Sequence, residues 1–197
     1  MKDKVKYVCK FIDASFDYNM WMAGAQKHIK DDSIKNINEV KKVKEAIIQL
    51  SKPIEKQILL YRGTTYFMYP GMLNIDVKKL TKVKQADNSF LQKFKKKTPI
   101  LIKSALSTST NRLVGEYYRK GSYGKKTGNY LHIIKVSKGI KVLDLKPIYK
   151  KCYPKFPKGP RVEYKGKDVY EDEVILPPDT ILYPMYRRGN IFYWQLK

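Results

Sequence analysis

The sequence contains few of the residues from which metal sites and catalytic triads are built. Among its 197 residues are two cysteines, Cys9 and Cys152, and two histidines, His28 and His132. The cysteines lie far apart and match no metal or redox spacing, so we expect two reduced, mostly buried thiols. The histidines are equally isolated, and His132 falls in an apolar alternation typical of a strand. We therefore expect no metal, and zinc hydrolases, Cys-His nucleophile enzymes and Ser-His-Asp triads are excluded.

Long apolar runs are also missing. No stretch reaches the roughly 18 consecutive apolar residues that a membrane-spanning helix needs. Charges interrupt residues 1–26 before an apolar signal-peptide core forms. Residues 121–126 are rich in glycine but lack the spacing and context of a phosphate-binding loop. We expect a cytoplasmic, monomeric protein without a membrane span or signal peptide.

Acidic residues are scarce. Asp and Glu number 18 against 41 Lys and Arg, which gives a formal net charge of +23, and all but six of the basic residues are lysine. Codon drift in an AT-rich genome raises lysine, but it should also have raised glutamate. The imbalance therefore favours an anionic partner, namely nucleic acid, an acidic protein or a phosphate-bearing substrate. A merely solvated lysine surface remains the alternative.

The hydrophobic pattern predicts an α+β fold. With 43% apolar residues the chain can form a core, and its length suits one compact domain. Residues 1–53 read as a helical segment packed on a core of residues 54–197, which is mainly antiparallel sheet. The predicted strands are 57–61, 130–136, 141–145, 173–176, 180–186 and 190–196, with one helix at 111–118 and lysine-rich loops at 78–97 and 146–167.

Three places in the predicted core carry chemistry. Arg62 ends a buried strand and is followed by Gly63. A hydroxyl cluster, Ser107, Thr108 and Ser109, precedes the internal helix, and the carboxylates of Glu171 and Glu173 flank Asp172.

Each of these places has an ordinary structural explanation. An arginine at a strand end is usually a surface residue, a Ser-Thr-Ser run is usually a helix cap, and an acidic triplet is usually a solvated turn. In this basic chain, however, the triplet runs directly into an apolar strand. Residues two apart at a strand start point to one side, so Glu171 and Glu173 are expected to face one cleft.

Taken in this order, the three motifs resemble the mono-ADP-ribosyltransferases of the Arg-Ser-Glu class. That class includes clostridial binary-toxin enzymes, vertebrate arginine-specific ecto-enzymes and transferases of T-even bacteriophages. The matching text is Tyr61-Arg62-Gly63, then Ala105 to Ser109, then Tyr170 to Pro177 with its Glu-x-Glu pair. The resemblance covers about residues 57–196 and implies an ADP-ribosyltransferase-like fold that uses NAD as substrate.

The resemblance also implies roles for these residues. Arg62 would hold the pyrophosphate of NAD, and Ser107 would hydrogen-bond Glu173. Glu173 would bind the ribose 2′-hydroxyl and stabilise the positive charge that develops as nicotinamide leaves. Glu171 would orient or deprotonate an acceptor guanidinium, which makes arginine the expected acceptor.

The remaining expected NAD contacts come from the same motifs. They are Gly63, Thr108 and Ser109, together with Tyr117 and Tyr118 of the internal helix, where the family often carries an aromatic residue.

Two departures from the class affect the expected acceptor and setting. The 66-residue gap from Ser107 to Glu173 is long, with the surplus expected at 146–167, so acceptor choice cannot be inherited from a relative. The missing export signal favours an intracellular or virion-delivered viral enzyme.

Three interpretations therefore remain. The first is an NAD-dependent transferase acting on an arginine of a host protein that is acidic or associated with nucleic acid, with some non-specific nucleic-acid affinity of its own. The second is a basic nucleic-acid-binding or virion protein in which the motifs are coincidental. The third keeps NAD but makes the protein an NAD glycohydrolase or a transferase to nucleic acid.

Overall fold

The structure is a computed structural model that describes residues 2–22, 34, 37–64, 91–120, 129–155 and 157–197. The predicted loop at 78–97 lies partly outside these residues, and within its described part residues 91–95 are helical, contrary to the prediction. The helices are α1 (Lys2–Asp13), α2 (Ser15–Met22), α3 (Ile37–Leu50), α5 (Arg112–Lys120) and α6 (Lys146–Cys152). The strands are β1 (Lys52–Pro53), β2 (Ile58–Thr64), β3 (Ile100–Ile102), β4 (Leu106–Ser109), β5 (Tyr130–Val136), β6 (Lys141–Asp144), β7 (Arg161–Tyr164), β8 (Lys167–Tyr170), β9 (Glu173–Leu176), β10 (Thr180–Arg188) and β11 (Ile191–Leu196).

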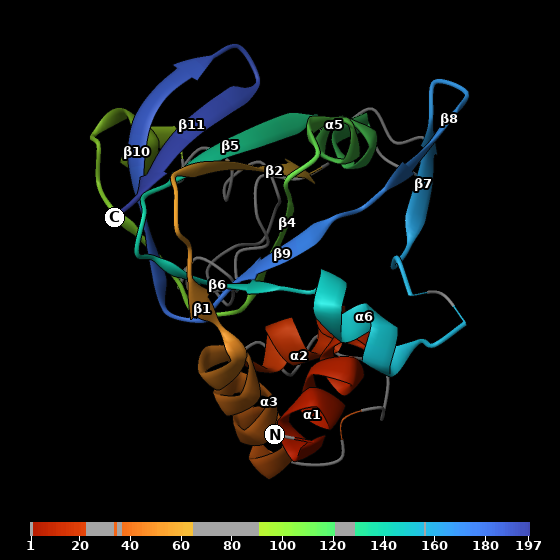
Figure 1. The fold of residues 1–197 in the computed structure, drawn as a ribbon. Coiled ribbons are helices and arrows are strands. Elements are labelled where there is room, and N and C mark those ends of the chain that lie inside the picture. Colours follow the sequence, from red (N-terminus) through yellow and green to blue (C-terminus); the bar gives the residue numbers. More distant parts are fainter. Residues whose placement is uncertain (1, 23–33, 35–36, 65–90, 121–128, 156) are drawn as a thin grey trace.

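Nine strands form one sheet in the order β1-β6-β9-β4-β2-β5-β11-β10-β3. Strands β5 and β11 run parallel, and the other pairs described are antiparallel. One buried cluster takes side chains from both ends of this order, among them Val142 of β6 and Ile102 of β3. The sheet is therefore bent around its main core, and the predicted α+β class with a mainly antiparallel sheet is confirmed (Figure 1).

The amino-terminal helices pack on the half of the sheet formed by β6 and β9 (Figure 1). Helix α3 buries Val40, Val43, Ala46 and Ile47, which recur at the three- and four-residue steps of one helical face. These side chains share a second core with Ile175 of β9. Because β1 pairs with β6, the expected boundary at residue 53 falls within the sheet.

The sequence analysis expected a loop at 146–167, but this segment contains a helix and part of a hairpin, and among its described residues only 153–155, 157–160 and the hairpin turn are neither helix nor strand. Its first part is α6, which begins with Pro147 in the first turn, where a missing backbone N–H costs nothing. Its second part belongs to the β7–β8 hairpin, whose turn places Lys165 and Gly166 at φ values of 54° and 72°. Positive φ at both turn residues suits the twist of a tight hairpin. The prediction failed because proline and lysine were interpreted as loop signals.

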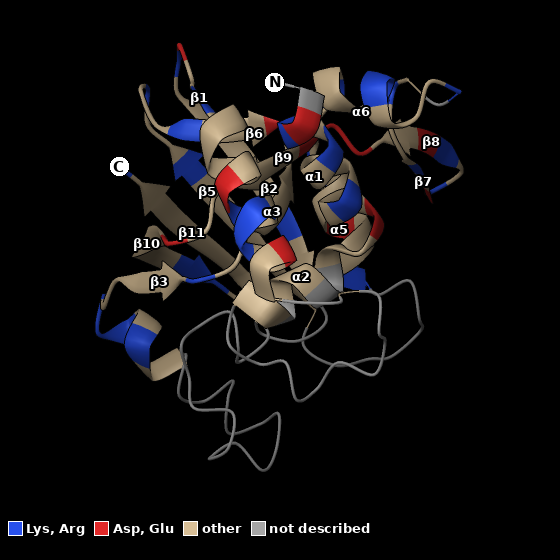
Figure 2. Ribbon diagram, turned by 90° about the horizontal axis from the view of Figure 1, so that it is seen from below, with Lys and Arg blue, Asp and Glu red and all other residues tan. Residues whose placement is uncertain are grey.

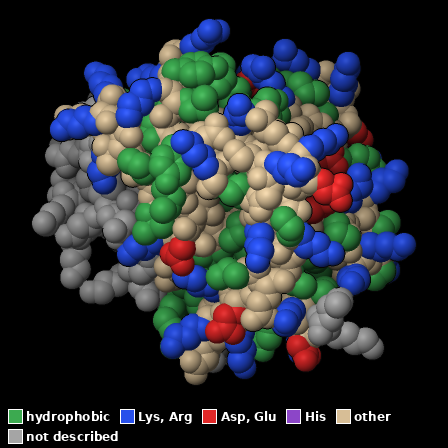
Figure 3. All heavy atoms as spheres, turned by 60° about the vertical axis from the view of Figure 1, so that its left-hand side comes forward, with side chains coloured by type: hydrophobic (Ala, Val, Ile, Leu, Met, Phe, Trp, Pro, Cys, Tyr) green, Lys and Arg blue, Asp and Glu red, His purple; other side chains and the backbone are tan. Residues whose placement is uncertain are grey.

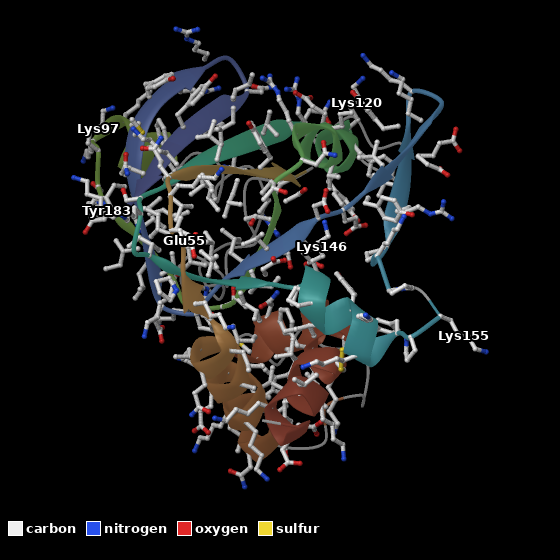
Figure 4. All side chains as sticks on the ribbon, viewed as in Figure 1. Glu55, Lys97, Lys120, Lys146, Lys155 and Tyr183 are labelled. Atoms are coloured by element: carbon white, nitrogen blue, oxygen red, sulfur yellow. A yellow bond between two sulfur atoms is a disulfide. The ribbon has the colours of Figure 1, made fainter. Side chains whose placement is uncertain are left out.

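We expected the two cysteines to be free thiols, but they form a disulfide. Cys9 of α1 and Cys152 of α6 are bonded across 143 positions of sequence, which Figure 4 shows as a yellow bond between the two helices. The sequence spacing concealed this pair because α6 follows β6 directly and is carried by the fold onto α1. Figure 2 shows that Lys and Arg are spread over helices and strands alike, whereas Asp and Glu are few.

Candidate active site

A cavity of about 790 Å³ lies where the amino-terminal helices, α5, α6 and the sheet meet. This volume falls within the usual range of small-molecule sites. Eight of the nine site residues expected from the sequence line it: Arg62, Gly63, Ser107, Thr108, Ser109, Tyr118, Glu171 and Glu173. The structure therefore brings together three motifs that lie 45 and 66 residues apart in the chain, counted from Arg62 to Ser107 and from Ser107 to Glu173.

Arg62 lies within β2 rather than at its end. Its Nη1 donates to the backbone oxygen of Ser107 at 2.6 Å, which fixes the guanidinium between β2 and β4. His132 is the cross-strand partner of Arg62 and is fully buried. Burial, and secondarily the Arg62 cation, lower the pKa of His132 to about 3. The histidine is therefore neutral near pH 7, and Arg62 supplies the positive charge at this point of the cavity.

The Ser-Thr-Ser run forms strand β4 rather than a helix cap. Thr108 Oγ1 donates to the carbonyl of Val174 at 2.6 Å, and Ser109 Oγ donates to the carbonyl of Glu171 at 2.5 Å. Both hydroxyls therefore tie β4 to the segment that carries the carboxylates. Ser109 also accepts a hydrogen bond from the backbone N–H of Asn111, at the start of α5.

The carboxylate of Glu173 is held by a residue that the sequence analysis did not identify. Tyr149 of α6 donates its hydroxyl to Glu173 Oε2 at 2.5 Å. Burial and the nearby carboxylates raise the pKa of Tyr149, so it remains a hydrogen-bond donor. Ser107, which was expected in this role, is the cross-strand partner of Ile175 and lies diagonally across from Glu173. Tyr149 is therefore a donor that the sequence analysis did not identify, and the role of Ser107 stays a prediction.

The Glu171 carboxylate is paired in the same manner. Tyr118 of α5 donates its hydroxyl to Glu171 Oε1 at 2.6 Å. Burial raises the pKa of Glu171, the hydrogen bond from Tyr118 lowers it, and the charge of Glu173 raises it, with a net upward shift. Each of the two carboxylates thus has its own tyrosine donor, from a different helix.

The sequence analysis expected strand alternation to place both carboxylates on one side. In the structure a turn before the strand brings them to the cavity. Strand β9 begins at Glu173, and Asp172 has a left-handed φ of 41°. The preceding residue, Glu171, is anchored by its backbone N–H to the carbonyl of Pro160 at 3.0 Å. Asp and Asn tolerate the left-handed conformation better than most residues, which suits the residue between the two glutamates.

Gly63 has a packing function. A Cβ at this position would lie 2.0 Å from the backbone oxygen of Gly115 and 2.2 Å from the backbone nitrogen of Arg119. The absence of a side chain therefore lets α5 approach β2 closely enough for Tyr118 to reach Glu171.

Tyr117 is the expected site residue that does not line the cavity. It packs with Val114, Val162 and Val169, between α5 and the β7–β8 hairpin. Its ring meets that of Tyr118 edge-on, with centroids 5.2 Å apart. Tyr117 therefore packs against Tyr118 outside the cavity and is not placed to stack on a ligand.

Sequence reasoning also missed the wall of the cavity that the amino-terminal helices provide, including Phe11, Ile12 and Asn19. The apolar spacing of these helices indicated only a core contact. Among the described residues, no group of three or more His, Cys, Asp or Glu side chains is placed to hold a metal ion. None of the described helices is both long and apolar enough to cross a membrane.

No protein-family model and no curated protein sequence matches the chain. Solved structures do. The C3 exoenzyme of Clostridium limosum aligns over 100% of this chain and 86% of its own, with a TM-score of 0.57 and 17% identity. Plx2a, an ADP-ribosyltransferase toxin from Paenibacillus larvae, aligns over 100% and 87%, with a TM-score of 0.55 and 16% identity.

A third structure, the ADP-ribosylating toxin BECa of C. perfringens with NADH, aligns over 100% of this chain and 44% of its own. Its TM-score is 0.57 at 13% identity. At such identities the likeness establishes the fold, and the fold of this chain is that of the ADP-ribosyltransferases, as the motifs indicated.

Proposed function

We propose that the protein is a mono-ADP-ribosyltransferase that transfers ADP-ribose from NAD to an arginine of another protein. The observation that carries this proposal is the convergence of Arg62, Glu171 and Glu173 on one cavity, with each carboxylate held by a tyrosine hydroxyl. Coincidental motifs in a purely structural protein would have no reason to meet in one cavity. The NADH in the BECa structure supports a dinucleotide as the ligand of this fold.

The chemistry of the cavity suits NAD. A guanidinium fixed by the Ser107 carbonyl is a suitable partner for a pyrophosphate, because its planar fork binds phosphate oxygens in pairs. The cavity volume of about 790 Å³ is large enough for a ligand of dinucleotide size. We assign Arg62 to the pyrophosphate, and Ser107 and Tyr118 to the nicotinamide end of the site.

The reaction breaks the bond between ribose C1′ and the nicotinamide nitrogen, and nicotinamide leaves with the bonding electrons. Glu173 stabilises the positive charge that develops on the ribose and holds the 2′-hydroxyl. A guanidine nitrogen of the acceptor then attacks C1′, and its proton passes to Glu171. A raised pKa suits Glu171 for this task because a base works best when its pKa approaches the working pH.

The overall charge defines the kind of acceptor. A net charge of +23 attracts the anionic pyrophosphate but repels free arginine. We therefore propose an acceptor arginine displayed on an acidic or nucleic-acid-associated protein, in line with a viral enzyme that modifies host machinery.

The test is incubation with labelled NAD and a cell lysate, followed by mass spectrometry of the modified side chains. Wild-type protein should label arginine. Glu171→Gln should lose this labelling while retaining some NAD hydrolysis, because only the acceptor step needs the base. Label on nucleic acid or on another side chain would contradict the assigned acceptor, and NAD hydrolysis without any transfer would identify a glycohydrolase.

A further inference from the structure

The outer face of the sheet carries a surface that the active site does not use. Four residues on neighbouring strands are paired side by side across the sheet. They are Leu59 of β2, Lys135 of β5, Gln195 of β11 and Tyr183 of β10. In the next row Tyr193 is paired with Tyr186. We call Leu59, Lys135, Tyr183, Tyr186 and Tyr193 the tyrosine face.

The aromatic rings of the tyrosine face are accessible. Tyr186 is 45% exposed and Tyr183 is 36% exposed. Tyr186 and Tyr193 already stack on each other, with ring centroids 4.1 Å apart and planes inclined by 18°. A shallow hollow of about 170 Å³ lies beside them, next to Leu59. Accessible, pre-stacked rings offer flat surfaces to another planar group.

The strands that bear the tyrosine face contain no carboxylate. Neither Asp nor Glu occurs in β2, β3, β5, β10 or β11. Cations accompany the rings instead: Arg188 lies 5.8 Å from the Tyr186 centroid, and Lys197 lies 5.5 Å from that of Tyr183. Figure 3 turns this side of the molecule forward and shows hydrophobic patches interspersed with Lys and Arg. The surface is therefore both aromatic and cationic.

The tyrosine face is separate from the proposed catalytic cavity. None of its five residues is among those that line the cavity. In Figure 4, Tyr183 lies on the β10 side of the molecule, whereas Lys146 marks the start of α6 near the carboxylates. A ligand on this face would therefore leave the cavity open.

We propose that the tyrosine face binds single-stranded nucleic acid. Aromatic rings on an open sheet stack on unpaired bases, and neighbouring cations neutralise the phosphates. Four strands spaced about 4.8 Å apart give a platform of roughly 15 Å, which accommodates two or three nucleotides. A duplex does not fit this arrangement, since its bases are stacked on one another. The absence of carboxylates from these strands and the net charge of +23 favour a polyanion over a protein of ordinary charge.

The test is fluorescence anisotropy of a labelled twelve-nucleotide oligo-uridine, with an equal length of duplex RNA as comparison and no NAD present. The wild type should bind the single strand more tightly than the duplex. Tyr186→Ala with Tyr193→Ala should weaken single-strand binding by about tenfold or more through loss of stacking. Tyr186→Phe with Tyr193→Phe should retain it, because the rings remain. Circular dichroism confirms that each variant is folded.

A matched charge control separates this site from the general lysine surface. Lys135→Ala with Arg188→Ala should lower the salt dependence of binding, by about two in the slope of log affinity on log salt. Lys150→Ala with Lys151→Ala removes the same charge from the exposed face of α6 and should have a smaller effect on affinity. Equal losses from both pairs, with no effect of the tyrosine changes, would overturn the proposal. So would duplex binding as tight as single-strand binding, or binding of an acidic protein alone.

Discussion

Two tyrosine hydroxyls hold the two carboxylates of the cavity, so the protein positions its charged groups through neutral donors. A hydrogen bond to a charged group is worth about 1.5–3 kcal/mol, which is enough to fix a carboxylate in one orientation. Tyr149 belongs to α6 and Tyr118 to α5. The geometry of the Glu-x-Glu pair therefore depends on both helices.

Tyr149→Phe should lower kcat by about tenfold to a hundredfold while changing the KM for NAD little, because the hydroxyl orients Glu173. The measurement is steady-state NAD turnover. The control is Tyr153→Phe: Tyr153 lines the same cavity, but its hydroxyl donates to Asp13. An unchanged kcat in Tyr149→Phe would show that Glu173 does not need this donor.

The pH dependence of transfer should report Glu171. Because its pKa is raised, the rate should fall as pH decreases through a midpoint above the ordinary 4.5. The hydrogen bond from Tyr118 lowers this pKa, so Tyr118→Phe should move the midpoint to higher pH. Tyr117→Phe, on the neighbouring ring, is the control. A midpoint that moves to lower pH in Tyr118→Phe, or not at all, would contradict this account.

At the scale of elements, helices α1 and α6 form a joined wall of the cavity. The Cys9–Cys152 disulfide links them, and Tyr149 lies three residues before Cys152 on α6. Anything that loosens α6 from α1 therefore also affects the tyrosine that holds Glu173.

Reduction of the disulfide should destabilise the protein. Closing so long a loop typically contributes about 2–4 kcal/mol, so urea unfolding in the presence of a thiol reductant should shift to lower denaturant. The Cys9→Ser, Cys152→Ser double variant should unfold at that lower value with or without reductant. Equal stability of the reduced and oxidised wild type would argue against the bond.

The elements also show what the sequence could predict. The spacing of Val40, Val43 and Ile47 predicted α3, and the apolar runs next to Arg62 and Glu173 predicted the strands that carry these two residues. Local patterns could not reveal Tyr149, because its partner is 24 residues away and the helix that carries Tyr149 was interpreted as a loop. The disulfide was hidden for the same reason, since the fold brings together residues 143 positions apart.

At the scale of the whole molecule, a protein with a net charge of +23 contains a cavity lined by two carboxylates. The disulfide adds a further constraint, because such bonds persist in oxidising compartments and are rare in the cytosol. It weighs against the cytoplasmic location that the amino terminus suggested. The long-range field nevertheless remains that of a strongly basic protein.

We expect the positive electrostatic field of the protein to determine which arginine is modified. Transfer to an arginine within an acidic peptide should be faster than to a neutral peptide of equal length, and the difference should shrink as salt rises from about 50 to 500 mM. Initial rates at fixed NAD measure this effect. A preference for the neutral peptide at low salt would show that the positive charge of the protein does not select the acceptor.

The most direct test of the proposed chemistry compares NAD turnover by Glu173→Gln and by Asp172→Asn. Both changes remove one negative charge from the same turn, and asparagine tolerates the left-handed backbone at 172. Glu173→Gln should lose about a hundredfold or more in nicotinamide release while still binding NAD, and Asp172→Asn should stay near the wild-type rate. Wild-type turnover by Glu173→Gln, or an equal loss in both variants, would contradict the assignment of Glu173 as the catalytic carboxylate.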